Sequence, residues 1–193
     1  MRNILIRTFG GRGIGYGHFY RCLSLAKAIK LIRNDVNIFF LINVDLVELL
    51  DGADFNYIVS DNLDDDIEKV DRLNVNLFIF DAYLGDDEYL KKIKTRTKLM
   101  LIDDNNDIYD TSIPDIIYNG NIHAFNLRYA GNKEQLKLLG PKFLIMKEEY
   151  WDKEAYTYNN IPKDSILITT GGTDEYGISL KIIEQLKTLD YKI

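Results

Sequence analysis

A run of glycines near the start of the chain constrains the fold more than any other feature. Residues 3–7 read NILIR, a short apolar run with the length and branching of a buried strand. Five glycines follow between residues 10 and 17. Residues 21–33 then read RCLSLAKAIKLIR, with apolar residues at spacings of three and four, which predicts a helix. The segment is therefore expected to form a strand, a glycine loop and a helix.

The start of this helix is a candidate site for an anion. The predicted apolar stripe of the helix consists of Cys22, Leu25, Ile29 and Ile32, with Ala26 beside them. Glycines let the backbone approach a ligand, and a helix N-terminus offers unpaired N–H groups and partial positive charge. We therefore assign Gly13, Gly15 and Gly17 to a phosphate or sugar-diphosphate site. The spacing fits neither the dinucleotide fingerprint nor the P-loop, and a tight connection without a ligand is the alternative.

His18 follows the glycines directly and is expected in the first turn of the helix. The positive end of the helix dipole disfavours imidazolium, so we expect a neutral ring at pH 7. A neutral imidazole can accept a proton from water, which makes His18 a candidate general base. The alternative is a histidine that caps a turn or packs against the sheet.

The composition excludes several classes of protein. Of the 193 residues, 46% are hydrophobic and 28% charged, as in ordinary globular proteins, and the net charge of −6 argues against nucleic acid as the main partner. Apolar stretches such as VNIFFLINV are too short to span a bilayer, and the N-terminus shows no secretory signal. One cysteine and two histidines argue against an internal disulfide and a His/Cys zinc site. We therefore expect a cytoplasmic protein.

Strand and helix patterns alternate along the chain, which predicts a doubly wound parallel sheet of the Rossmann-like α/β class with helices on both faces. The expected strands after the first are residues 36–42, 56–59, 76–80, 98–102 and 115–118, and the expected helices are 45–50, 64–73 and 86–95.

Polar residues follow several of these strands. Because ligands bind at the carboxyl ends of parallel strands, Asp81, Tyr83 and the acids at 103 and 104 are expected beside the glycine loop. Asp81 as a turn cap and Tyr83 as a surface aromatic are the alternatives. The acids at 103, 104 and 107 suit Mg²⁺, but an Asp/Asn turn is the preferred interpretation. His123 is interpreted as structural or peripheral.

The pattern restarts near the end of the sequence. Residues 165–189 read SILITTGGTDEYGISLKIIEQLKTL, which predicts a strand, a glycine turn at Gly171 and Gly172, and a helix. The predicted apolar stripe of this helix consists of Ile178, Ile182, Ile183 and Leu186. We expect a first domain over residues 1–160 and the first strand–helix unit of a second, similar domain over 161–193. One such unit cannot bury its own apolar faces, so a fragment or docking on a partner is expected.

Several motifs resemble one family of enzymes. Residues 15–26, GYGHFYRCLSLA, resemble the G-x-G-H-x-x-R-x-L-x-L-A signature of the UDP-sugar hydrolase of pseudaminic acid biosynthesis and of related spore-coat polysaccharide proteins. The resemblance continues at Asp81-Ala82-Tyr83, Ile102-Asp103-Asp104, GPKFLIMKEEY and GGTD, and covers nearly the whole chain in order.

The resemblance implies a two-domain fold similar to glycosyltransferase B, with a UDP-sugar bound between the domains. It implies hydrolysis of UDP-2,4-diacetamido-2,4,6-trideoxy-β-L-altropyranose, in which His18 activates water and Tyr83 lies near the sugar. Arg21 and Asp81, with Gly171, Gly172 and Thr173, are expected to contact substrate or phosphate. Because a diphosphate leaves readily, a base, a phosphate cradle and positioning can suffice, and we expect no metal or cofactor.

The sequence departs from the family pattern in one respect. In this fold the second domain carries most nucleotide contacts, and the sequence contains only its first unit. We therefore expect the chain to bind UDP-sugar weakly by itself. Two other functions remain open: a glycosyltransferase of the same fold, and a non-catalytic domain that binds a partner.

Overall fold

The structure, a computed structural model, describes residues 1–131, 133–152, 165–170, 174 and 176–187. The chain divides into two compact units, Met1–Glu148 and Glu149–Ile193. The predicted domain boundary at residue 160 lies outside the described residues, so that boundary stays a prediction. No helix in the described ranges is long and apolar enough to cross a bilayer.

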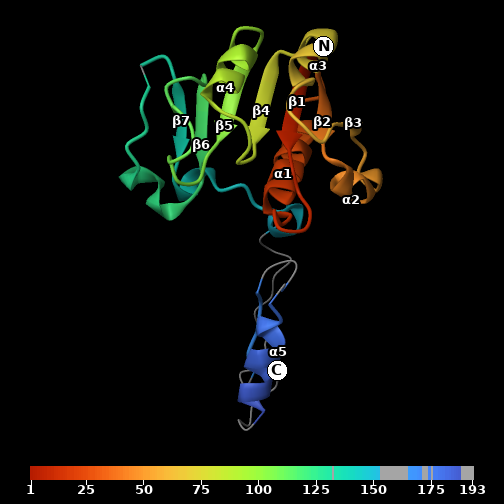
Figure 1. The fold of residues 1–193 in the computed structure, drawn as a ribbon, viewed down its shortest axis with the longest axis vertical. Coiled ribbons are helices and arrows are strands. Elements are labelled where there is room, and N and C mark those ends of the chain that lie inside the picture. Colours follow the sequence, from red (N-terminus) through yellow and green to blue (C-terminus); the bar gives the residue numbers. More distant parts are fainter. Residues whose placement is uncertain (132, 153–164, 171–173, 175, 188–193) are drawn as a thin grey trace. The chain divides into compact units, whose positions relative to one another are not determined.

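The first unit is built on one parallel sheet of seven strands in the order β3-β2-β1-β4-β5-β6-β7 (Figure 1). The strands are β1 (Arg2–Thr8), β2 (Val36–Ile42), β3 (Asn56–Val59), β4 (Leu77–Asp81), β5 (Lys98–Ile102), β6 (Ile116–Asn119) and β7 (Leu136–Leu139). Every pair of neighbours is parallel. The strand order reverses between β1 and β4, as in a Rossmann-like doubly wound sheet, which confirms the predicted fold class.

Helices connect the strands of this sheet. They are α1 (Gly17–Ile32), α2 (Val47–Asp51), α3 (Asp66–Arg72) and α4 (Asp87–Lys94), with 3₁₀ turns at Val44–Leu46, Ile122–Asn126, Pro141–Phe143 and Glu148–Tyr150. Acidic residues begin α4 and lysines end it, as the helix dipole favours, and the Asp86 carboxylate caps it by accepting the Tyr89 N–H at 2.9 Å.

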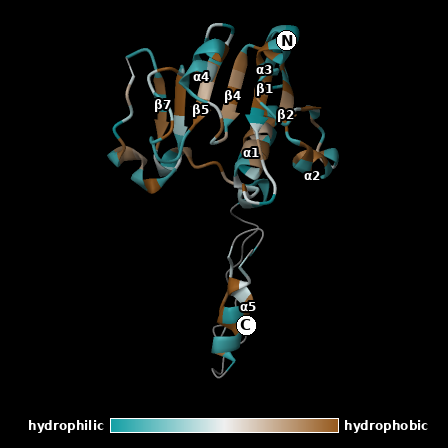
Figure 2. Ribbon diagram, in the orientation of Figure 1, coloured by the Kyte–Doolittle hydropathy of each residue, from teal (hydrophilic) through white to brown (hydrophobic). Residues whose placement is uncertain are grey.

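Alternate residues of the strands pack into two apolar cores. Ile4 and Ile6 of β1 face the core beneath α1 and α2, and Leu5 faces the core beneath α3 and α4. Apolar residues are accordingly concentrated in the strands (Figure 2). Burial on both faces explains why the strands read as continuous apolar runs rather than alternating ones.

The apolar stripe of α1 differs from the prediction at one position. The helix begins at Gly17, so His18 lies in its first turn as expected, and its buried apolar residues are Phe19, Cys22 and Ala26. Ile32 is 76% exposed. Leu25 and Ile29 are partly buried against the same core, so the predicted stripe packs against the sheet except at Ile32.

The structure also differs from the prediction at two strands, one unexpected and one not formed. β7 was not predicted, because its four residues, LKLL, are too few to show a periodicity. The strand expected from Ser165 is not formed over residues 166–170. A strand is stabilised by hydrogen bonds to a neighbour, and the described residues of the second unit supply none for this segment.

The helix predicted in the second unit is present as α5 (Ile178–Leu186). The Asp174 carboxylate accepts the backbone N–H groups of Ile178 at 2.8 Å and Ser179 at 3.1 Å, so this residue of the GGTD motif caps the helix. No residue of α5 is buried.

A buried ion pair ties β1 to the helices on one face of the sheet. Arg7 Nε lies 3.0 Å from Asp66 Oδ2, and both side chains are fully buried. Tyr89 of α4 donates to the same Asp66 oxygen at 2.8 Å, and the Arg7 guanidinium lies over the Phe9 ring. Burial lowers the pKa of Arg7 and raises that of Asp66, and the attraction between the two opposes both shifts.

The substitution Arg7→Met is expected to lower the free energy of unfolding by about 3–5 kcal/mol, because it leaves the Asp66 carboxylate buried without its cation. Urea denaturation followed by circular dichroism measures the change. Arg33→Met is the control, since Arg33 pairs with Asp35 at an exposed position. Equal effects of the two substitutions would contradict the prediction.

Candidate functional site

The glycine loop is closed on itself between β1 and α1. Gly15 N–H donates to Gly11 O at 2.8 Å, and Gly11 N–H donates to Gly15 O at 3.2 Å. Gly11, Gly13 and Gly15 have positive φ values of 132°, 83° and 80°, which explains why these positions need glycine. The N–H of Gly15 is thus used within the loop, so a phosphate at this site would have to use other N–H groups.

Gly17 differs from the other loop glycines. Its φ is not in the left-handed region, and a Cβ at this position would meet nothing within 4 Å. The described protein therefore gives no steric reason for glycine at the first residue of α1. Positions 13 and 15 also face open space, so the loop leaves room in front of the helix N-terminus.

His18 lies in the first turn of α1 and pairs with Asp81 at the end of β4. The distance from His18 Nδ1 to Asp81 Oδ1 is 2.6 Å, and the two side chains are 13% and 1% exposed. An ionised carboxylate only accepts hydrogen bonds, so this short contact favours a proton on Nδ1. Arg21 Nη2, which can only donate, lies 3.1 Å from the same nitrogen, and it also contacts both carboxylates at 2.8 and 3.0 Å. We assign the proton to Nδ1 because the contact with Asp81 is the shorter one, and Nε2 of a neutral ring is then the acceptor that a general base requires.

Arg21, one helical turn after His18, connects two carboxylates. Its Nε donates to Asp81 at 2.9 Å, and Nη1 donates to Asp104 at 2.7 Å. Nη2 lies 2.8 Å from Asp81 Oδ1 and 3.0 Å from Asp104 Oδ2. Burial lowers the pKa of Arg21, but these hydrogen bonds outweigh it and raise the pKa above its usual value. The guanidinium therefore positions the two carboxylates, and its contact with phosphate stays a prediction.

Tyr83 lies beside His18 and is also held by Asp104. The rings of Tyr83 and His18 meet edge to face, with centroids 4.7 Å apart. Tyr83 Oη donates to Asp104 Oδ2 at 2.7 Å. Burial, and then this hydrogen bond, raises the pKa of Tyr83, so the phenol stays protonated at neutral pH. The structure thus brings together four predicted residues: His18, Arg21, Asp81 and Tyr83.

Asp103 and Asp104, which follow β5, have different surroundings. Asp103 is 3% exposed and accepts hydrogen bonds from Tyr129 Oη at 2.6 Å and the Asn106 N–H at 2.7 Å. The contact with Asn106 forms the expected Asp/Asn turn. Asp104 accepts a hydrogen bond from Asn121 Nδ2 at 2.9 Å, in addition to those from Arg21 and Tyr83. Within the described residues, no group of three acidic, histidine or cysteine side chains is arranged to hold a metal.

Sequence reasoning missed Asn119, the last residue of β6. Asn119 Nδ2 donates to Asp104 O at 3.0 Å and to Tyr129 Oη at 2.8 Å. His123 Nε2 lies 3.1 Å from the same Asp104 carbonyl, so this exposed histidine is at the rim of the site. The one signal in the sequence that could have identified Asn119 as a site residue is its position at the end of a strand. The identity of its partners depends on the neighbouring loop and could not be derived.

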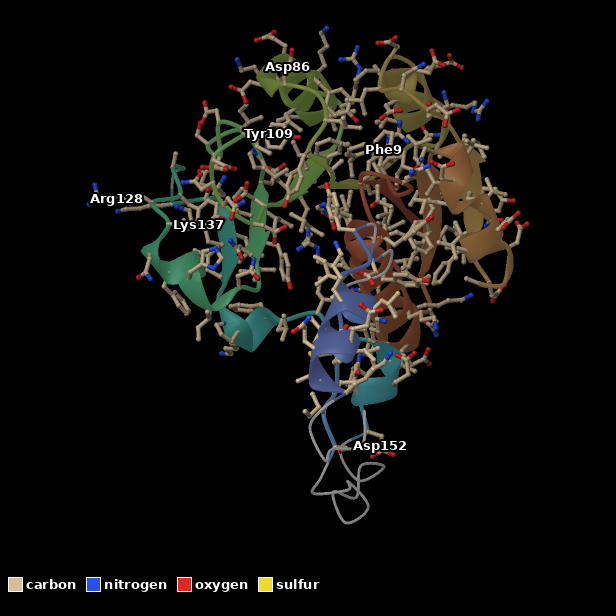
Figure 3. The ribbon with its side chains drawn as sticks, turned by 60° about the horizontal axis from the view of Figure 1, so that its bottom comes forward. Phe9, Asp86, Tyr109, Arg128, Lys137 and Asp152 are labelled. Carbon is tan, nitrogen blue, oxygen red and sulfur yellow. The ribbon has the colours of Figure 1, made fainter. Side chains whose placement is uncertain are left out.

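A pocket of about 220 Å³ lies next to His18. It is lined by Phe9, Gly13, Ile14, His18, Ala82, Tyr83 and Leu84. Phe9 lies in the interior of the first unit (Figure 3). Two segments distant in sequence, residues 9–18 and 82–84, thus meet where the strand order reverses, which is where doubly wound sheets bind ligands. Gly171, Gly172 and Thr173 lie outside the described residues, so their role stays a prediction.

The chain is similar to three proteins along most of its length, although no protein-family model matches it. It is 26% identical to an uncharacterised protein of Methanocaldococcus jannaschii, covering 97% of this chain and 40% of the relative. It is 28% identical to the UDP-2,4-diacetamido-2,4,6-trideoxy-beta-L-altropyranose hydrolase of Campylobacter jejuni, and the alignment covers 95% of this chain and 65% of the relative. It is 29% identical to the spore coat polysaccharide biosynthesis protein SpsG of Bacillus subtilis, and the alignment covers 90% of this chain and 52% of the relative.

This chain thus spans between 40% and 65% of the length of these relatives. Among solved structures, MurG of Acinetobacter baumannii aligns with 71% of this chain and 44% of its own length, at a TM-score of 0.48 and 10% identity.

We expect the pKa values of the adjacent acids Asp103 and Asp104 to be shifted in opposite directions. Burial raises the pKa of Asp103 above its usual value. Burial would also raise the pKa of Asp104, but the hydrogen bonds from Arg21 outweigh it and lower the pKa to about 2. Carboxyl ¹³C shifts followed by NMR between pH 2 and about 7 measure both values.

The two pKa shifts make the stability of the fold depend on pH in opposite ways. Asp104 stabilises the fold above its unfolded pKa of about 3.9, and this contribution is lost as pH falls toward 2. Asp104→Asn should therefore destabilise the protein at pH 6 more than at pH 3 (about one unit below the unfolded value). Asp103→Asn should show the reverse dependence. Titration of Asp104 above Asp103 would contradict the assignment.

Proposed function

We propose that this chain provides the catalytic site of a nucleotide-sugar hydrolase that acts in polysaccharide or nonulosonic (pseudaminic) acid biosynthesis. The observation that carries the proposal is the pairing of His18 Nδ1 with Asp81, beside a pocket that His18 itself lines. The similarity to a named UDP-sugar hydrolase and to a spore coat polysaccharide biosynthesis protein supports the same substrate class.

In the proposed reaction a water oxygen attacks the anomeric carbon of the sugar. His18 Nε2 takes one proton from this water as the carbon–oxygen bond forms. The bond between the anomeric carbon and the phosphate oxygen breaks, and its electron pair leaves with UDP. Asp81 holds the tautomer of His18 and stabilises the imidazolium that forms, which is the role of the acid in a catalytic triad.

Arg21 and Tyr83 position this machinery. Arg21 fixes both oxygens of the Asp81 carboxylate: Nε donates to Oδ2, and Nη2 donates to Oδ1, the oxygen that His18 also contacts. Tyr83 closes one wall of the pocket and packs against the His18 ring. Because its proton is committed to Asp104, Tyr83 contacts the sugar through its ring rather than acting as a base.

The diphosphate is proposed to bind at the N-terminus of α1, in front of Gly13 and Gly17. The free N–H groups and the dipole of this helix stabilise the negative charge that develops on the leaving phosphate. The open space in front of Gly17 accommodates it. Nucleotide contacts from Gly171, Gly172 and Thr173 are part of the same proposal, as is weak binding of UDP-sugar by this chain alone.

His18→Ala is expected to lower the rate of UDP release from UDP-diacetamido sugars by roughly 10²–10⁴-fold, because the general base is lost. His123→Ala is the matched control, since this second histidine lies at the rim and is exposed. Asp81→Asn should also reduce the rate, because an amide can donate to Nδ1 and so favours the wrong tautomer. Unchanged UDP release in His18→Ala would refute the proposal.

Heavy-oxygen water distinguishes the bond that breaks and the class of reaction. Label in the free sugar is expected, because water attacks carbon. Label in UDP would instead indicate attack on phosphorus. UDP release that requires an added sugar or lipid acceptor would indicate a glycosyltransferase, and binding of a partner without any turnover would indicate a non-catalytic domain.

Gly17→Ala tests the phosphate site. This substitution should stabilise the fold by about 0.4–1 kcal/mol, since the backbone is compatible with alanine and the Cβ meets no protein atom. It should nevertheless raise KM roughly tenfold, which corresponds to about 1.4 kcal/mol of binding free energy. Gly13→Ala is the comparison, because its positive φ predicts a loss of stability. An unchanged KM in Gly17→Ala would contradict the proposed position of the phosphate in front of Gly17.

A further inference from the structure

The guanidinium of Arg21 holds one carboxylate along each of two edges of its plane. Along the first edge, Nε donates to Asp81 Oδ2 at 2.9 Å and Nη2 donates to Asp81 Oδ1 at 2.8 Å. Along the second edge, Nη1 donates to Asp104 Oδ1 at 2.7 Å and Nη2 donates to Asp104 Oδ2 at 3.0 Å. Both contacts are bidentate, and together they fix the plane of the guanidinium.

The nitrogen that the two edges share, Nη2, also lies beside His18. Nη2 carries two hydrogens and accepts none. Three acceptor atoms surround it: Asp81 Oδ1, Asp104 Oδ2 and, at 3.1 Å, His18 Nδ1. Each hydrogen points along one edge of the guanidinium, so both hydrogens go to carboxylates and His18 Nδ1 receives neither. Nδ1 therefore keeps its own proton and donates it to Asp81 Oδ1 at 2.6 Å.

This arrangement depends on Asp104, although Asp104 acts on His18 only through Arg21. Without the Asp104 carboxylate, one Nη2 hydrogen loses its acceptor, and the guanidinium loses one of the two contacts that fix its plane. Because Arg21 is only 22% exposed, leaving that hydrogen without a partner is unfavourable. The acceptor within reach is His18 Nδ1. When Nδ1 accepts from Arg21, the ring proton lies on Nε2, and Nε2 no longer takes a proton from water.

We propose that Asp104 is a positioning residue that determines the tautomer of His18 through Arg21. Its carboxylate holds one hydrogen of Nη2 away from Nδ1 and thereby keeps Nε2 as the acceptor. The effect on catalysis rests on the proposed function, whereas the tautomer is a property of the folded protein alone. Asp81 ends β4 and Asp104 follows the adjacent strand β5, so the sheet sets the two carboxylates at the spacing that one guanidinium bridges.

The position of the ring proton is measured by ¹⁵N NMR on the full-length natural protein labelled at histidine, at a pH where the ring is neutral. His18→Ala identifies the signals of His18. We expect the proton on Nδ1 in the natural protein and on Nε2 in Asp104→Ala. Combining Arg21→Met with Asp104→Ala should return the proton to Nδ1, because Asp81 remains as acceptor and the competing donor is gone. A purely structural role of Asp104 gives no such recovery.

Asn121→Ala is the matched control. It removes a different hydrogen bond to Asp104, from Asn121 Nδ2 to Oδ1 at 2.9 Å, and leaves both Asp104 oxygens available to Arg21. The proton should therefore stay on Nδ1. Asp104→Asn is the second variant, for use if circular dichroism shows that Asp104→Ala does not fold. Its amide has the shape of the carboxylate but one acceptor oxygen in place of two, so both tautomers should be populated.

UDP release is measured on the same proteins. Asp104→Ala should lower kcat by roughly 10²–10⁴-fold with a smaller change in KM, because the base is lost from the chemical step. A proton that stays entirely on Nδ1 in folded Asp104→Ala or Asp104→Asn would overturn this inference, and UDP release by the natural protein would then still support hydrolysis. A change of tautomer in a protein that releases UDP from no UDP-sugar would overturn the hydrolase and keep the role of Asp104.

Discussion

The site depends on one partly buried interaction, the guanidinium of Arg21 between the carboxylates of Asp81 and Asp104. Two carboxylates close together repel each other, and a planar cation with several fixed donors offsets that repulsion and sets their orientation. Asp81 then orients His18, and Asp104 orients Tyr83. The geometry of the candidate base and of the neighbouring aromatic wall thus follows from a single side chain in the second turn of α1.

The parallel sheet brings these groups to one edge. β1 and β4 are adjacent although they are separated by two other strands in the sequence, and their registers align Thr8 with Asp81. The glycine loop leaves β1 at the same edge and turns tightly into α1. His18 consequently reaches Asp81 from the neighbouring connection. The reversal of strand order opens the space that the pocket occupies.

The first unit contains another ion pair, Arg7 with Asp66, which is fully buried and whose role differs from that of the Arg21 cluster. Arg7 lies inside the core and stacks on Phe9, and it joins β1 to α3 and α4. Phe9 also lines the pocket, so the packing that holds the sheet together also fixes one wall of the candidate site. Core and site therefore share a residue, and we expect substitutions at Phe9 to affect both stability and ligand binding.

The sequence by itself determined the fold class, most element positions and the proximity of His18 to the residues that follow β4, because apolar periodicity and glycine placement are local signals. β2, β3 and β5 have the predicted bounds, and His18 lies in the first helical turn as expected. Only the tertiary structure decided that Arg21 holds carboxylates, that Asn119 and Tyr129 support the Asp103–Asp104 loop, and that Ile32 is exposed. These outcomes depend on which segments become neighbours in the sheet, and that is set by packing across the whole unit rather than by any short stretch of sequence.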